Sequence, residues 1–214
     1  MPVIAMFPLG SVLFPGMPLA LRVFEERYLK MMGAILEDDT PQFGVVLIER
    51  GHEVGGGEKR FEVGTLAEVL EIAAPDGPLA VVARGTKRFR VVNWLEDDPY
   101  PKAEIEVLDS LAHDSDLEQP LSDTEEIVRD TLRYLESLSD DLPWSADIDL
   151  SDDDEERLWQ LAGISPLGPL DHQDFLMEES MGSLAAKIQT TVQEALEVFK
   201  LSQQTLGDND DDDD

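Results

Sequence analysis

The chain has 214 residues, 42% of them hydrophobic, and a formal net charge of −31 from 47 acidic and 16 basic side chains. This length can bury a sizeable core in one or two units, and every apolar run is shorter than the roughly 18–20 residues that cross a bilayer. The absence of cysteine excludes disulfides and thiolate chemistry and suits a reducing cytoplasm, where we expect the protein. The acidic excess is expected to repel nucleic acid and anionic membranes, so we predict neither as a partner.

The first elements are predicted in residues 7–28, FPLGSVLFPGMPLALRVFEERY, where short apolar runs alternate with turn residues. Pro fixes φ and lacks a backbone donor, while Gly permits positive φ, so Pro15-Gly16 is expected to turn the chain between two short strands. Apolar residues at three- and four-residue spacing then predict a helix over residues 24–36. These residues are Phe24, Tyr28, Met31, Met32 and Ile35.

Further strands are predicted up to residue 108, because β-branched and alternating runs are separated there by Gly, Pro and Asp. They cover residues 43–49, 61–73, 79–85, 87–95 and 102–108, with a glycine loop at 55–57. Residues 1–112 are therefore predicted to form a β-rich domain with one inserted helix.

From about residue 109 the chain becomes strongly acidic, with 18 acidic and 2 basic residues over 109–156. Ser122 and Glu125 fit a capping box at the start of a helix, and a second helix is predicted to start at Ser151 and to stop at Gly163.

A short helix near residues 174–178 and a longer one over 183–203 complete a predicted helical bundle over 121–206. Residues 207–214, GDNDDDDD, have no apolar anchor and are expected to form a disordered acidic tail.

No motif in the chain predicts a catalytic, metal or nucleotide site. The glycines at 55–57 lack the Lys and hydroxyl of a phosphate loop, and a calcium-loop-like start at Asp147 lacks the required Gly and Glu. His52, His113 and His172 lie in different segments without paired ligands, so each is expected at the surface. We therefore predict no catalytic residue, no metal and no cofactor.

One basic cluster, RGTKRFR at residues 84–90, interrupts the acidic sequence. Strand alternation predicts Arg88 and Arg90 on a solvated face and Phe89 in the core. A nucleic-acid-binding stripe is the alternative interpretation of this cluster.

The order of these pieces resembles the N-terminal substrate-binding domain of Lon-type ATP-dependent proteases. The resemblance rests on Phe7-Pro8-Leu9, Leu13-Phe14-Pro15-Gly16, Pro18-Leu19, Val23-Phe24-Glu25 and Arg27-Tyr28, with further matches up to residue 91. It is strong over residues 1–108 and weaker over the acidic half, and Glu26 stands where the family commonly has Pro. The resemblance implies an α+β fold with a PUA-like, β-barrel-type N-terminal domain. It also implies polypeptide clients and a stand-alone member, since the sequence contains no ATPase or Ser-Lys peptidase motif.

The resulting hypothesis is a non-catalytic module that binds unfolded or specific polypeptides in proteolysis or protein quality control, with a protease or chaperone as a further partner. Client binding is predicted at Phe14, Met17 and Leu19, because a segment rich in Pro and Gly is not expected to bury all its apolar residues. The alternative is that these side chains fill the core. Two other functions remain open at this point: an enzyme with a carboxylate site on the same fold, and a PUA-like RNA-binding protein.

Overall fold

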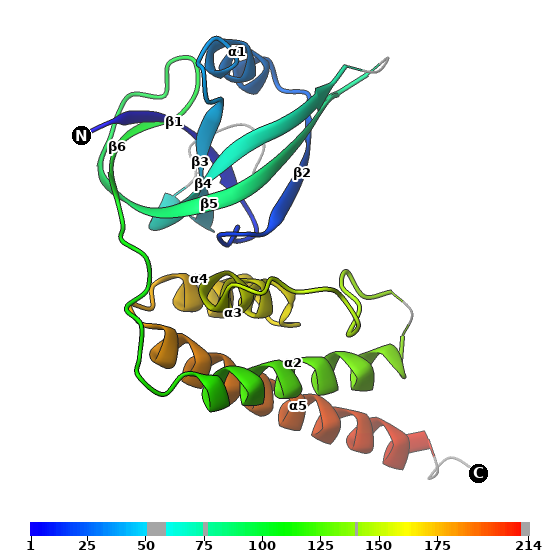
Figure 1. The fold of residues 1–214 in the computed structure, drawn as a ribbon. Helices are drawn as coiled ribbons and strands as arrows, with labels where there is room; N and C mark the ends of the chain where they lie inside the picture. Colours follow the sequence, from blue (N-terminus) through cyan, green and yellow to red (C-terminus); the bar gives the residue numbers. More distant parts are fainter. Residues whose placement is uncertain (51–58, 75–76, 140, 211–214) are drawn as a thin grey trace.

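The computed structural model describes residues 1–50, 59–74, 77–139 and 141–210, with side chains described as far as residue 202. The predicted glycine loop at 55–57 and His52 lie outside the described residues. The molecule has a curled sheet with one helix on its outer side, and a helical part packs beneath the sheet (Figure 1).

The described sheet runs in the order β2-β5-β4-β3-β1-β6, and β5 also pairs with β6. Its strands are β1 (Val3–Leu9), β2 (Pro18–Val23), β3 (Gln42–Arg50), β4 (Lys59–Ala73), β5 (Leu79–Trp94) and β6 (Lys102–Val107). β1 and β3 are parallel, whereas the other pairs are antiparallel. Because β6 pairs with β1 on one side and with β5 on the other, the strands from β5 to β6 curl round into a barrel-type layer.

Both faces of β1 are buried, which explains its nearly continuous apolar sequence. Met6 packs with Phe89 and Ile105 in a cluster inside the curled sheet. Its neighbour Phe7 points the other way and stacks on Tyr28 of α1 (Glu26–Ile35), with 4.2 Å between ring centroids. The helix therefore covers the outer side of the sheet, as the inserted helix of the predicted α+β fold.

Two predictions in this half need correction. Phe24 precedes α1 and is 61% exposed, so it does not belong to the buried helical face. The strands predicted at 79–85 and 87–95 are one strand, β5, which passes through Gly85 without ending. A Cβ at Gly85 would lie 2.1 Å from the Phe14 carbonyl oxygen, so this glycine admits a close backbone contact instead of a turn.

The helical part has two layers (Figure 1). α3 (Asp154–Ile164) and α4 (Pro169–Leu176) lie against the sheet, and α2 (Glu118–Glu136) and α5 (Met181–Asp210) lie side by side below them. Apolar side chains of both halves belong to one continuous core, in which Val23 and Met31 of the sheet side join Leu161 and Ile188 of the helices.

The predicted helix ends differ from the observed ones for local reasons. α2 begins at Glu118, so Ser122 lies inside it and makes no cap. Pro120 is the third residue of this helix, where the N–H that proline lacks has no helical partner in any case. α3 starts one residue after Asp153, whose side chain accepts a hydrogen bond from the Glu156 N–H at 2.9 Å. Gly163 lies inside α3, which continues to Ile164.

The last two helices are longer than predicted. α4 begins at Pro169, a favoured residue for a first helical turn, and ends at Leu176. α5 is described to Asp210, while residues 211–214 lie outside the described part of the chain. The tail over 207–214 and the domain division between residues 112 and 121 stay predictions.

Candidate functional site

The turn at residues 14–17 connects the first two strands and sets the geometry of the site. The Met17 N–H donates to the Phe14 carbonyl at 3.2 Å, and Gly16 has φ of 77° after Pro15, the residue pattern of a type II turn. The turn is held on β5 by two backbone hydrogen bonds, from Gly16 N–H to Gly85 O at 2.8 Å and from Gly85 N–H to Met17 O at 2.9 Å. A sequence-encoded turn thus presents its side chains to the helical layer.

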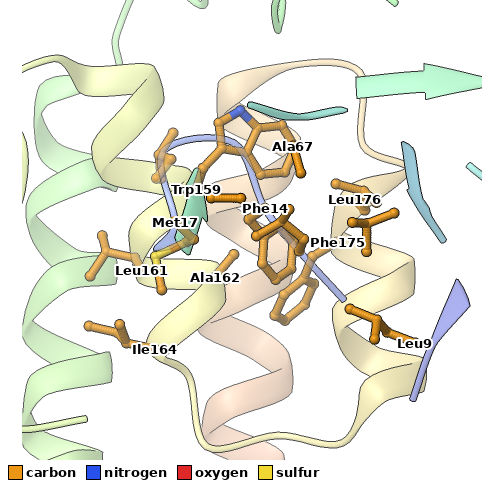
Figure 2. Close-up of a cluster of buried hydrophobic side chains, with 14 of the residues drawn as sticks. Leu9, Phe14, Met17, Ala67, Trp159, Leu161, Ala162, Ile164, Phe175 and Leu176 are labelled. Carbon is orange, nitrogen blue, oxygen red and sulfur yellow. The ribbon is translucent and has the colours of Figure 1, made fainter. Parts of the chain in front are cut away.

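Phe14 is the main contact between this turn and the helices. It is 1% exposed, and its ring stacks on Trp159 of α3 with 5.8 Å between centroids and 25° between planes. It also makes a T-shaped contact with the ring of His172 of α4, with 5.5 Å between ring centroids. Figure 2 shows the ring inserted among side chains of α3 and α4, beside Phe175. Phe14 therefore anchors the sheet on the helices.

Met17 is 7% exposed and lies against α3, and Leu19 is half-buried on β2. A Cβ at Gly163 would lie 2.9 Å from Met17 Cε and 3.0 Å from its Cγ, so the missing side chain of Gly163 lets the two segments approach. Phe14 and Met17 thus contribute to the core, while Leu19 retains partial exposure. Their role in client binding stays a prediction.

All three residues line one cavity of about 310 Å³ between the first turn and the helical layer. Its other walls come from Leu9 and residues 11–13, from the loop at 142–144, and from the end of α3 with the loop that follows, at 163–167. The lining is predominantly apolar, and its polar side chains are Ser11, Ser165 and His172. The volume lies at the lower end of ligand-binding sites and suits a few apolar side chains.

His172 closes one side of the cavity. Its Nε2 lies 3.1 Å from the Ser165 carbonyl oxygen, which can only accept, so Nε2 carries the hydrogen. Burial lowers the pKa of His172, although the Ser165 carbonyl and Asp171 oppose the shift. The prediction that this histidine lies at the surface is therefore wrong, because Phe14 and Phe175 pack on its ring. His113 is exposed, as predicted.

The prediction that Arg88 lies on the solvated face is also wrong, because Arg88 is buried. The predictions of a buried Phe89 and an exposed Arg90 are confirmed. Arg88 is 7% exposed, because the helical layer covers this part of β5. Its guanidinium donates to three backbone carbonyls, of Leu176 at 2.9 Å, Glu178 at 2.5 Å and Asp109 at 3.3 Å. It fixes α4 and the segment after β6 to the sheet.

Sequence reasoning missed the helical wall of the cavity. Strand and helix periodicity gives no information on residues 142–144 or 163–167, which lie in loops or at a helix end. One signal was present: Leu142-Pro143-Trp144 is a short apolar group inside a strongly acidic stretch. These apolar residues do not belong to the buried face of a helix, so their presence in an acidic segment indicates a local packing or binding role.

Comparison with known proteins agrees with the fold. The family model of the ATP-dependent protease La (LON) substrate-binding domain matches residues 3–194, so the chain belongs to this family. The crystal structure of a Lon N-terminal domain protein from Xanthomonas campestris is similar, with a TM-score of 0.60 and 23% identity, covering 89% of this chain and 98% of that one. The N-terminal domain of the Mycobacterium avium complex Lon protease gives a TM-score of 0.63 at 12% identity, covering 90% and 98%.

Among curated relatives, the Lon protease of Halothermothrix orenii is 30% identical over 112 residues, which are 51% of this chain and 14% of that protein. The Lon protease of Cytophaga hutchinsonii is 24% identical over 148 residues, or 68% and 18%. The matched family is a substrate-binding domain and not a catalytic one. In the described part of the chain, no helix combines the length and apolar character needed to span a membrane.

Proposed function

We propose that this protein is a non-catalytic module that binds polypeptide segments in proteolysis or protein quality control, with the cavity beside Leu19 as the binding site. The observation that carries the proposal is an apolar cavity of about 310 Å³ in a member of a substrate-binding family. Its clients are unfolded or specific polypeptides, handed to a separate protease or chaperone in the cytoplasm.

The cavity wall supports binding by apolar contact. Leu19, Leu142 and Trp144 are each partly exposed while they line the cavity, so they can contact an incoming side chain without unfolding the turn. Phe14 and Met17 act in this proposal as the buried floor. An apolar side chain that leaves water here gains about 25 cal/mol for each Å² buried.

The enzymatic alternative receives little support from the site. The residues that line the cavity include no carboxylate. A general acid needs a raised pKa at neutral pH, whereas the two shifted carboxyl groups have lowered pKa values and pair with lysines outside the cavity. Lys30 lowers the pKa of Glu26. For Glu178, burial raises the pKa, but Lys187 and Ser183 together lower it by more than burial raises it.

The RNA-binding alternative depends on the basic cluster of β5, and half of its basic residues are engaged within the protein. Arg88 is buried against carbonyl oxygens, and Arg84 forms an ion pair with Glu156. Among the described residues, Lys87 and Arg90 are the two basic side chains of the cluster with neither an ion pair nor a side-chain hydrogen bond, which is too little positive charge to overcome a net charge of −31.

Binding can be tested with a fluorescently labelled, permanently unfolded model protein. We compare Leu19→Asp with Leu70→Asp, because Leu70 is 60% exposed on β4 and does not line the cavity. The proposal expects Leu19→Asp to weaken binding at least about tenfold, or about 1.4 kcal/mol, while Leu70→Asp binds as the parent does. Circular dichroism checks that both variants stay folded. Equal binding by a folded Leu19→Asp variant would exclude this cavity.

A further inference from the structure

The charge around the cavity is strongly one-sided. The wall formed by the first 21 residues contains no charged side chain. Part of the opposite wall, residues 142–144, belongs to the acidic loop, which we define as residues 141–156, with eight acidic residues and no basic residue. In Figure 1 the part of this loop before α3 lies in the helical layer that faces the sheet, on the side where β2 begins.

Part of this negative charge is available to a partner. Glu156 pairs with Arg84, and Glu155 accepts a hydrogen bond from the Leu111 N–H. Asp141, Asp149 and Asp152, in contrast, are exposed and form no ion pair among the described residues. Asp141 directly precedes Leu142, which lines the cavity.

We infer that the cavity selects polypeptide segments in which apolar side chains are flanked by Lys or Arg. This inference rests on the proposed function and specifies the class of client. The apolar residue enters between Leu19 and Trp144, and the cationic flanks lie against Asp141 and the following aspartates of the acidic loop. Each exposed ion pair contributes little by itself, so several pairs together give selectivity on the order of tenfold.

The same charges argue against other occupants. A second copy of this chain would bring another net charge of −31 against the acidic loop, and like charges repel. The chain's own acidic end, residues 207–214, is disfavoured for the same reason. An anionic nucleic acid or membrane surface also meets the wrong sign. A cationic polypeptide complements both the apolar wall and the acidic wall.

The test uses three labelled peptides and fluorescence anisotropy. The first has a central Leu-Phe-Leu flanked by lysines, the second has glutamines in place of the lysines, and the third keeps the lysines but has Ser-Gly-Ser at its centre. We expect the first peptide to bind about tenfold more tightly than the second at about 50 mM salt, and the advantage to shrink at about 500 mM. The third is expected to bind at least tenfold more weakly than the first.

Each outcome separates the two levels of the proposal. Equal, salt-independent binding of the first two peptides would overturn the selection of cationic clients while leaving the proposed function intact. No binding by any of the three, or by the unfolded protein, would overturn the proposed function itself. Equal binding of the first and third peptides would show attraction by charge alone and would overturn the role of the cavity.

A pair of charge-matched variants locates the effect. Asp141→Asn with Asp149→Asn removes two charges from the acidic loop, and Asp38→Asn with Asp39→Asn removes two exposed charges after α1. We expect the first pair to weaken binding of the lysine peptide about threefold or more and to leave the glutamine peptide unchanged, while the second pair has less than a twofold effect. Equal losses would assign the preference to the overall charge and overturn the role of the loop.

Discussion

The guanidinium of Arg88 lies 4.9 Å from the centre of the Trp159 ring, which joins the middle of β5 to α3. The same indole ring stacks on Phe14 from the first turn. Three segments of the chain therefore meet at one aromatic side chain, and the outer two, which contain Phe14 and Trp159, are more than 140 residues apart in the sequence. Because both walls of the candidate cavity depend on this meeting point, stability and client binding are expected to be coupled.

Arg88→Met is expected to lower the free energy of unfolding by about 2–4 kcal/mol, because the carbonyl groups of Leu176, Glu178 and Asp109 lose their donor. The methionine keeps much of the contact with Trp159. Urea denaturation followed by tryptophan fluorescence measures the change. Arg90→Met is the control, since Arg90 is exposed on the same strand and should have an effect of less than about 0.5 kcal/mol. Equal effects of the two variants would show that the buried hydrogen bonds contribute little.

Two glycine variants are expected to have opposite effects. Gly85→Ala puts a Cβ 2.1 Å from the Phe14 carbonyl oxygen, which is backbone and has little freedom to move, so we expect a loss of at least about 3 kcal/mol. Gly33→Ala in α1 meets no atom within 4 Å and is expected to stabilise the protein by up to about 1 kcal/mol. Thermal melts measured by circular dichroism compare both with the parent. A Gly85→Ala protein as stable as the parent would contradict the observed contact.

The stability of the protein is expected to fall as the pH drops below about 6.5, the ordinary pKa of histidine. Burial lowers the pKa of His172 in the folded state, so the unfolded state binds a proton first. The protein therefore keeps its full stability above about pH 6.5 and loses more of it as the pH falls towards the pKa of the folded state. His172→Gln is expected to flatten this part of the curve, whereas exposed His113→Gln leaves it unchanged. The measurement is urea denaturation at a series of pH values from about 7.5 to 5.5.

Met17→Asp is expected to unfold the protein or to destabilise it by several kcal/mol, since Met17 is 7% exposed and packs on Gly163. Met17→Leu conserves the apolar volume and should cost less than about 1.5 kcal/mol. Differential scanning calorimetry compares the two. A folded Met17→Asp variant that no longer binds the unfolded model protein would instead assign Met17 a direct role in client contact, as the sequence prediction has it.

The elements of the sheet were predictable because their signals are local. Pro15-Gly16 specifies a turn by its backbone preferences alone, and it forms the predicted turn. The buried face of α1 follows directly from helical periodicity at Tyr28, Met31, Met32 and Ile35. The family resemblance, which is strongest in this half, then supplied the α+β fold.

The cavity could not be predicted, because it depends on contacts between distant segments. An arginine at an alternating strand position normally points to solvent, and only the helical layer packed on β5 makes Arg88 a buried donor. Gly163 has the sequence character of a helix stop, but its function depends on Met17, which lies 146 residues earlier in the chain. Tertiary packing decides such positions, and periodicity contains no information about it.

The insertion of Phe14 between α3 and α4 also has a consequence for synthesis. The ribosome makes this turn before its partners Trp159 and His172, which follow Phe14 by 145 and 158 residues. At about 5–20 residues per second, nascent chains therefore expose an unpaired Phe14 and Met17 for as long as the ribosome takes to reach these partners. Until α3 and α4 leave the exit tunnel, this protein presents the same apolar surface as the unfolded polypeptides it is proposed to bind.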